Sequence, residues 1–189
     1  MITFCADIGG SRLKSALVDE TGEIRDLRVD RWTRGLDPGP LFHELAGRLQ
    51  MHRKRTGEDP RSLGLSIAAI VENGRTVRFS TNLDGANSKA GPTDLDELSR
   101  EHLGLPARAG NDGHCMALGE HRYGAGTGTD HLVTLCLGTG VGGGVIAGGR
   151  LLRGARGAAV EVGHIQVDSS DEARACGCGA RGCLETYTS

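Results

Sequence analysis

The order of apolar and polar positions along the chain predicts a mixture of short strands and helices. Runs that are continuously apolar, or that alternate apolar with polar residues, are typical of strands. They occur at residues 2–8, 13–19, 24–32, 62–71, 107–111 and 131–138. Asn73-Gly74 adds a hairpin signal before the segment TVRFS. The pattern therefore predicts an α/β chain.

Helical spacing appears first after Pro38. Leu41, Leu45 and Leu49 share one face there, because residues four apart lie on the same side of a helix. This helix runs into HRKR (52–55), which we interpret as a solvated basic last turn favoured by the helix dipole, not as a nucleic-acid patch. Two further helices are predicted, from Thr93 to Gly104 and from Asp112 to Gly124.

Composition narrows the class of protein. The chain has 189 residues, 38% of them hydrophobic and 24% charged, with a net charge of −2, which describes a globular protein without a nucleic-acid-binding bias. The N-terminus MITFCADIGG lacks the features of a signal peptide, and no segment has the apolar length of a membrane span. We therefore expect a cytoplasmic protein with reduced thiols and no membrane partner. The 31 glycines, densest at residues 124–163, indicate backbone that approaches something closely, usually a ligand.

Two glycine-rich turns are candidate phosphate sites. DIGGS (7–11) joins two predicted strands, and its amides and the Ser11 hydroxyl suit phosphate oxygens, with Asp7 placed to hold Mg²⁺ through water. The alternative is an ordinary tight turn. LGTGVGGG (137–144) has G-x-G-x-x-G spacing, but a strand follows it, so it is not a dinucleotide-binding loop. Together the two hairpins would hold one polyphosphate from two sides.

A third candidate lies at Asn111-Asp112, where a predicted strand turns into a helix. Asp112 there has two interpretations. It is either a helix N-cap, or a general base that takes the proton of a substrate hydroxyl as its oxygen attacks phosphorus.

The fourth candidate is CGCGARGCLE (176–185), which holds three cysteines within eight positions. A reducing compartment argues against a disulfide knot and leaves a metal cage, a redox pair or free thiols. Structural zinc needs four nitrogen or sulfur ligands, and His164 in EVGH can fold back across the polar loop SSDEARA. We therefore predict a zinc site of His164, Cys176, Cys178 and Cys183. Three other cysteines in apolar patterns are expected to be small buried residues: Cys5, Cys115 and Cys136.

These four sites, in this order, resemble the ROK family of sugar kinases and sugar-responsive repressors. DIGGSRLKSALVD resembles the family's first phosphate hairpin, NDGHCMALGE its catalytic segment and LGTGVGGGVI its second phosphate loop. EVGH with CGCGARGCLE resembles its signature and zinc knuckle. The resemblance runs from residue 5 to 187 and implies an actin/hexokinase-like (ribonuclease H-like) α/β fold of two lobes with a sugar cleft between them. We expect a small N-terminal lobe over 1–108 and the start of the large lobe over 109–189.

Residue roles follow from the resemblance position by position. Asp112 would be the base on the sugar hydroxyl, most often the 6-OH. His164 would hold zinc with one ring nitrogen and the sugar with the other, and the zinc would tie the EVGH strand to the CLE turn. The implied sugar contacts are Asn82, Asn111, Asp112, Glu161, His164 and Glu185. The implied phosphate and nucleotide contacts are Asp7, Gly9, Gly10, Ser11, Gly138, Thr139 and Gly140.

The chain departs from the family pattern at several positions. They are Ser11 and Arg12 (usually Thr and Lys), Ala68-Ala69 (usually a turn with Gly or Pro beside the sugar), Val160 (usually Gly) and the residue after Asp84-Gly85 (usually Trp). Family members also continue well past CLETYTS, so the chain resembles a member with an incomplete large lobe.

The resemblance implies an enzyme that uses ATP and Mg²⁺ to phosphorylate a hexose, with glucose and its 6-hydroxyl as the expected acceptor, in a homodimer. The alternatives are a non-catalytic sugar-binding or regulatory protein, an inactive fragment, or a zinc-stabilised interaction module. DNA binding is not expected, because the first phosphate hairpin begins at residue 7 and leaves no room for a helix-turn-helix. The sequence alone does not distinguish among hexoses, or ATP from polyphosphate as donor.

Overall fold

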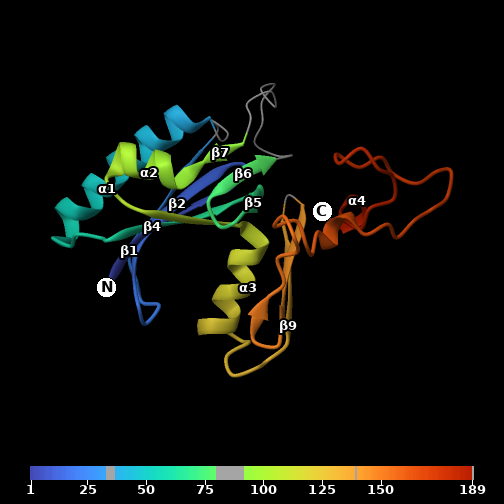
Figure 1. The fold of residues 1–189 in the computed structure, drawn as a ribbon. Helices are drawn as coiled ribbons and strands as arrows, with labels where there is room; N and C mark the ends of the chain where they lie inside the picture. Colours follow the sequence, from blue (N-terminus) through green and yellow to red (C-terminus); the bar gives the residue numbers. More distant parts are fainter. Residues whose placement is uncertain (33–36, 80–91, 139, 189) are drawn as a thin grey trace. The chain divides into compact units, whose positions relative to one another are not determined.

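The computed structural model describes residues 1–32, 37–79, 92–138 and 140–188 (Figure 1). The chain forms two compact units, Met1–Asn111 and Asp112–Ser189. The lobe boundary predicted between residues 108 and 109 falls three residues earlier, inside strand β8 (Ala107–Asn111). Within the described ranges, no helix has the length and apolar character needed to cross a bilayer.

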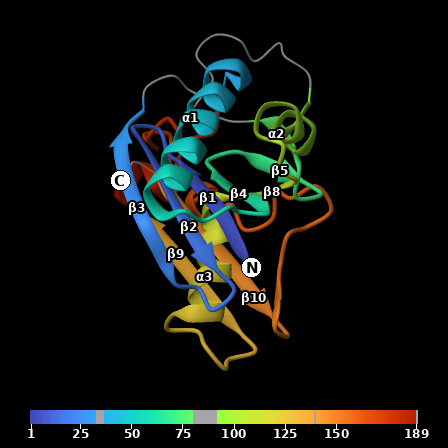
Figure 2. The same ribbon diagram turned by 90° about the vertical axis from the view of Figure 1, so that its left-hand side faces the viewer.

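The first unit is built on a five-stranded sheet in the order β3-β2-β1-β4-β8. Strands β1 (Ile2–Ile8), β2 (Arg12–Asp19) and β3 (Ile24–Arg31) are antiparallel neighbours, whereas β4 (Ser62–Ile67) runs parallel to β1 and β8 runs parallel to β4. Figure 2 shows helix α1 (Pro38–Thr56) crossing in front of these strands. A second, small sheet contains β5 (Ile70–Glu72), β6 (Thr76–Phe79) and β7 (Thr93–Asp94), and helix α2 (Leu95–Leu103) follows it.

The core of this unit lies between α1 and one face of the sheet. Phe4 and Ile8 of β1 are fully buried, and they pack in one cluster with the leucines of α1. The predicted leucine stripe is confirmed, since Leu41, Leu45 and Leu49 are all at most 2% exposed. Because burying such a side chain stabilises a fold by about 1.5–3 kcal/mol, this stripe fixes α1 on the sheet.

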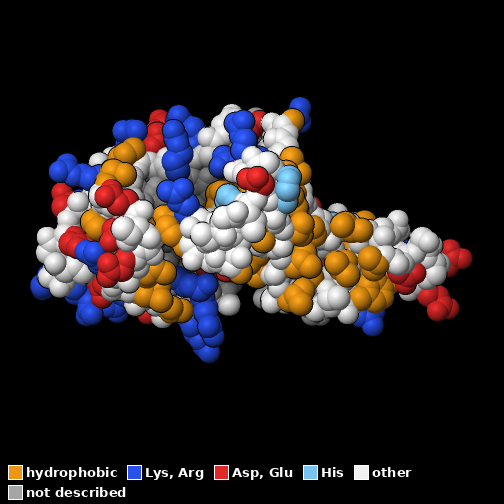
Figure 3. All heavy atoms as spheres, turned by 90° about the horizontal axis from the view of Figure 1, so that it is seen from below, with side chains coloured by type: hydrophobic (Ala, Val, Ile, Leu, Met, Phe, Trp, Pro, Cys, Tyr) orange, Lys and Arg blue, Asp and Glu red, His pale blue; other side chains and the backbone are white. Residues whose placement is uncertain are grey.

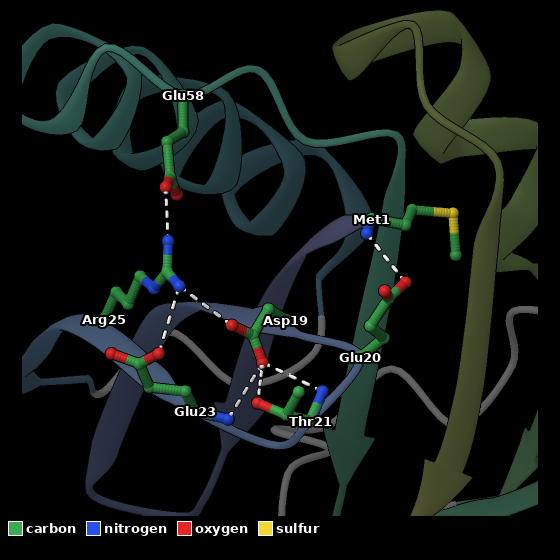
Figure 4. Close-up of polar contacts among 7 residues, drawn as sticks. All are labelled: Met1, Asp19, Glu20, Thr21, Glu23, Arg25 and Glu58. Carbon is green, nitrogen blue, oxygen red and sulfur yellow. Dashed lines mark hydrogen bonds and ion pairs between the residues drawn. The ribbon is translucent and has the colours of Figure 1, made fainter.

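The turn between β2 and β3 is held by polar contacts that leave little freedom to the hairpin (Figure 4). The Asp19 carboxylate accepts hydrogen bonds from the Thr21 amide (2.9 Å) and hydroxyl (2.6 Å) and from the Glu23 amide (3.1 Å). Arg25 then joins Asp19 to Glu58, at 2.9 and 2.7 Å. The guanidinium thereby ties the hairpin to the segment that follows α1.

Two predicted elements have different boundaries. The strand predicted over 62–71 is divided into β4 and β5, because the Ala69 amide donates to the Ile67 carbonyl (2.8 Å) and turns the chain. The helix predicted from Thr93 begins two residues later. Asp94 caps it by accepting from the amides of Asp96 and Glu97, while its backbone still pairs with β6.

The interpretation of HRKR as wholly solvated is wrong at His52, which is completely buried. Its Nδ1 donates to Asp26 (2.9 Å), and the Ser15 hydroxyl donates to its Nε2 (3.0 Å), which is the pairing that a neutral imidazole allows. Burial lowers the pKa of His52, and the Asp26 carboxylate opposes this only in part, while the positive charges of Arg28 and Arg48 lower it further. The helix thus ends in a buried histidine followed by exposed or half-buried basic residues.

The second unit begins with helix α3 (Asp112–Tyr123), which packs on strands β9 (Leu132–Leu137) and β10 (Val141–Ala147). With β11 (Arg150–Leu151) these strands form an antiparallel sheet in the order β11-β10-β9. This order repeats β3-β2-β1 of the first unit, and in both units a glycine-rich turn follows the first strand. A 3₁₀ turn, η1 (Val162–His164), and the short helix α4 (Glu185–Thr188) complete the unit.

Strand β9 is not the buried strand that its apolar sequence predicts. Val133, Leu135 and Leu137 are 64%, 58% and 69% exposed, because α3 covers the opposite face, where Thr134 is buried. Cys136 is exposed as well, so the expectation that it is buried is wrong; Cys5 and Cys115 are half-buried. Figure 3 shows hydrophobic side chains on the surface, right of centre.

The buried histidine predicts how the stability of the first unit depends on pH. Between the usual histidine pKa of about 6.5 and the lower value in the fold, the unfolded chain binds a proton that the folded chain does not. The free energy of unfolding should therefore fall as the pH drops through this window. Urea unfolding at several pH values measures this free energy. The fluorescence of Trp32, the single tryptophan, reports the unfolding because this residue is buried in the core.

Replacing the histidine by glutamine provides the control. His52→Gln should flatten this pH dependence, whereas His43→Gln, at an exposed histidine of the same helix, should leave it in place. Equal slopes in the wild type and in His52→Gln would contradict the assignment of the effect to this residue.

Candidate functional site

Glycines in the second unit bring backbone segments into direct contact. A Cβ atom at Gly113 of α3 would overlap the backbone of Gly143 in β10, and one at Gly163 of η1 would overlap the carbonyl of Val141. Larger residues at these positions would push both elements away from β10. Part of the glycine density at 124–163 thus serves packing inside the protein.

This packing places four ionisable residues of the predicted sugar site close together. Asp112 begins α3, Glu161 precedes η1, His164 ends η1 and Glu185 begins α4. Although the Glu161 side chain also reaches the surface, its partial burial raises its pKa. The negative charges of Asp112 and Glu185 add to that rise, while His164 and His114 oppose it, so all these groups lie within electrostatic reach of Glu161.

Asp112 satisfies the geometry of a helix N-terminus and also remains accessible. Its Oδ1 accepts from the Gly113 amide at 2.9 Å, and its side chain is exposed. A carboxylate that the first turn of a helix holds in place, and that solvent reaches, suits either interpretation given above. Asn111, the last residue of the first unit, donates from Nδ2 to the Ala69 carbonyl at 3.4 Å, so the unusual Ala68-Ala69 turn lies beside it.

The predicted metal ligands form one cluster. A ligand atom from each of His164, Cys176, Cys178 and Cys183 lies within 4.8 Å of the others. The Sγ atoms of Cys178 and Cys183 are 3.8 Å apart, and Cys176 Sγ is 3.6 Å from His164 Nδ1. Four ligands at about 2.0–2.3 Å from a tetrahedral zinc ion would be separated by roughly 3.3–3.8 Å, so the residues fit the metal.

A metal must displace the thiol protons before it can bind these cysteines. Burial raises the pKa of Cys183 to about 12, and the adjacent Cys176 and Cys178 thiols add to this. A thiol that resists ionisation among other thiols becomes a thiolate when a bound cation offsets the charge.

The expectation that EVGH forms a strand is wrong. The His164 amide donates to the Glu161 carbonyl at 3.0 Å, which folds this segment into the η1 turn.

The first glycine hairpin is held by contacts of its own. Asp7 accepts from the Ser66 hydroxyl at 2.7 Å and pairs with Lys14 Nζ at 2.8 Å. The Gly9 amide donates to the Arg12 carbonyl, while Gly10 and Ser11 are exposed. Lys14 is not among the residues predicted for this site, although the register of the two strands places it opposite Asp7.

The second glycine hairpin closes through a hydrogen bond from the Gly138 amide to the Gly140 carbonyl, at 2.9 Å. The next amide, of Val141, donates to Glu185 Oε2 at 3.2 Å. A predicted sugar contact is therefore in contact with a predicted phosphate loop. Two predicted residues, Asn82 and Thr139, lie outside the described residues.

Val160 holds a backbone conformation that suits glycine. Its φ is +68°, in the left-handed region that β-branched residues avoid at a cost of about 1–2 kcal/mol. This is the position at which the family resemblance expects glycine. The strain lies directly before Glu161, in the segment that carries two predicted sugar contacts.

The chain is similar in sequence to a known family and to sugar kinases within the curated proteins. Residues 3–189 match the profile of the ROK family. The chain is 34% identical over 189 residues to a glucokinase of Streptomyces coelicolor, covering all of this chain and 56% of that protein. It is 33% identical over 193 residues to an N-acetylmannosamine kinase of Escherichia coli O9:H4, covering all of this chain and 62% of that protein.

Among solved structures, the chain is similar to a ROK family glucokinase from Streptomyces griseus in complex with glucose and AMPPNP. The TM-score is 0.84 at 34% identity, over 99% of this chain and 57% of that one. The predicted actin/hexokinase-like α/β fold class is therefore confirmed. The chain spans little more than half the length of the glucokinases it matches.

The strain at Val160 yields a stability prediction. Val160→Gly should raise the free energy of unfolding of the second unit by about 0.5–1 kcal/mol, because it removes a strain of 1–2 kcal/mol and adds part of the entropy cost of glycine. Differential scanning calorimetry measures the change. Val167→Gly, at an exposed valine outside the left-handed region, should lower stability instead; a loss of stability in both variants would contradict the strain.

Proposed function

Because the chain belongs to the ROK family, we propose that it carries the catalytic and sugar-binding residues of a kinase that transfers a phosphoryl group from ATP to a hexose. Glucose is the proposed acceptor, at its 6-hydroxyl, in keeping with the similarity to two glucokinases. The observation that carries the proposal is the convergence of Asp112, Glu161, His164 and Glu185 in one unit, next to a glycine loop. Hexose and ATP are the proposed partners; a homodimer and a cytoplasmic location stay predictions.

The four residues have complementary chemistry toward a sugar. Carboxylates such as Glu161 and Glu185 accept hydrogen bonds from neighbouring hydroxyls. His164 directs Nδ1 at the cysteine cluster, which leaves Nε2 for a hydroxyl. Asp112 is exposed and oriented by the first turn of α3, as a base requires when it takes the proton of the attacking hydroxyl.

Phosphate binding is proposed for the two glycine hairpins. Amides of the two glycine turns would donate to phosphate oxygens, and the Ser11 hydroxyl would add a donor. The Gly9 and Gly138 amides would do so only on leaving the carbonyls of Arg12 and Gly140 that they bond in the free chain. Asp7 would hold Mg²⁺ through water, and the metal would neutralise charge on the phosphates. In the free chain Lys14 pairs with Asp7 at 2.8 Å. Mg²⁺ bound at Asp7 would leave this ammonium group for a phosphate oxygen.

A structural zinc ion is proposed at His164, Cys176, Cys178 and Cys183. Two pairs of ligand atoms, 3.6 and 3.8 Å apart, lie at spacings that suit a tetrahedral ion, and all four lie within 4.8 Å of one another. Bound zinc would tie η1 to the segment that leads into α4, and so hold Glu161, His164 and Glu185 toward the same sugar. The ion has no proposed part in the phosphoryl transfer.

The catalytic assignment is tested by Asp112→Asn. This variant should lose turnover by roughly 10²–10⁴-fold, because the amide cannot take the proton, while the hexose dissociation constant stays nearly unchanged. A coupled assay of nucleotide consumption and calorimetric titration with glucose measure the two effects. Asp130→Asn, at an exposed aspartate of the same unit, is the matched control and should retain turnover.

Two results would overturn parts of the assignment. Full turnover in Asp112→Asn would remove this residue from the chemistry. Glucose binding by the wild type without any nucleotide binding or turnover would favour the non-catalytic alternatives, a sugar-binding protein or an inactive fragment.

Metal removal tests the zinc proposal. Cys178→Ser should lose the bound metal, lower the melting temperature of the second unit and weaken glucose binding at least about tenfold, because the sugar contacts are no longer held together. Cys136→Ser, at an exposed cysteine outside the cluster, should change none of these. Elemental analysis, thermal melting and calorimetry provide the readouts. Unchanged glucose affinity after verified metal loss would refute the coupling of metal to sugar.

A further inference from the structure

The carboxylate of Glu185 links two parts of the second unit. Its Oε2 accepts from the Val141 amide at 3.2 Å, at the end of the second glycine hairpin. Its Oε1 accepts from the Cys176 thiol at 3.6 Å and lies 3.8 Å from His164 Nδ1. Only 23% of the side chain is exposed, so the carboxylate is held between the hairpin and the cysteine cluster.

The hairpin is built to admit this carboxylate. A Cβ atom at Gly140 would lie 2.5 Å from Glu185 Oε2, so the absence of a side chain at 140 makes room for the oxygen. The Gly138 amide is used to close the turn by donating to the Gly140 carbonyl. The Val141 amide, which follows the turn, is the donor that Glu185 engages.

A carboxylate and a phosphate compete at such a place. Both are anions that accept from backbone N–H groups, and one N–H cannot give a full hydrogen bond to both. Two negative charges a few ångströms apart also repel each other, more strongly where part of the surrounding water is excluded. With Glu185 on the Val141 amide, the hairpin is therefore a weaker phosphate site than its sequence indicates.

We propose that Glu185 is an autoinhibitory contact, whose carboxylate occupies the second glycine hairpin of the free chain and weakens its affinity for phosphate groups. A hexose removes this inhibition, because its hydroxyls donate to the carboxylate and draw it from the Val141 amide. This second step rests on the proposed function. By linkage, the hexose and the phosphate donor then strengthen each other's binding, and the hexose-bound chain is the form that accepts the nucleotide.

The test uses the full chain in zinc-replete buffer, with magnesium tripolyphosphate as a probe that needs no adenine pocket. Amide resonances of the ¹⁵N-labelled chain, Val141 included, are followed as the probe is added without sugar. Glu185→Gln keeps the side-chain shape and one acceptor oxygen but removes the charge, and should bind tripolyphosphate roughly tenfold more tightly than the wild type. Glu172→Gln, an equal charge change at an exposed residue of the preceding loop, should bind it as the wild type does.

A second titration adds glucose. In the wild type, glucose should shift the Val141 amide and tighten tripolyphosphate binding several-fold, and in Glu185→Gln this tightening should be absent. Equal sugar-free tripolyphosphate affinity in the wild type and Glu185→Gln, or an equal gain in both glutamine variants, would overturn the proposal. Tighter binding by Glu185→Gln alone, in a chain that binds no hexose, would support the inhibitory contact and refute the hexose assignment. The spectra also show whether each variant is folded.

Discussion

The close approach of α3 and η1 to strand β10 is the constraint on which the candidate site depends. At Gly113 and Gly163 the backbone of each element lies directly against β10, with no room for a Cβ atom. Because Asp112 directly precedes Gly113, and Glu161 and His164 lie within two residues of Gly163, this packing sets the positions of three side chains of the predicted sugar site. A substitution at Gly113 would displace Asp112, and one at Gly163 would displace Glu161 and His164.

The same packing brings carboxylates close to one another, and backbone amides stabilise their negative charge. Asp112 and Glu185 both lie within electrostatic reach of Glu161, and partial burial raises the pKa of Glu161. Backbone amides at the start of α3 and at Val141 stabilise two of the carboxylates by hydrogen bonding. A ligand rich in hydroxyl donors would stabilise this arrangement further, which is why a sugar suits it better than an anion.

The two units use one topological plan in different ways. Each contains three consecutive antiparallel strands with a glycine turn after the first, although the second unit begins with helix α3. In the first unit, two parallel strands, β4 and β8, extend the sheet beyond β1, and helices cover an apolar core. In the described part of the second unit, β9 is an edge strand with one exposed apolar face. An apolar run therefore produced a buried strand in one unit and a half-exposed strand in the other.

The sequence by itself determined the order of elements, the leucine face of α1, and the four residues of the histidine–cysteine cluster, because periodicity and ligand chemistry are local properties. Only the tertiary structure decided the burial of His52, the positive φ of Val160 and the contact of Glu185 with the glycine hairpin. Each of these depends on segments distant in sequence that meet in space, or on a backbone angle fixed by its surroundings. The spacing of residues along the chain does not predict such contacts. The proposed competition of Glu185 with phosphate therefore rests on the tertiary structure.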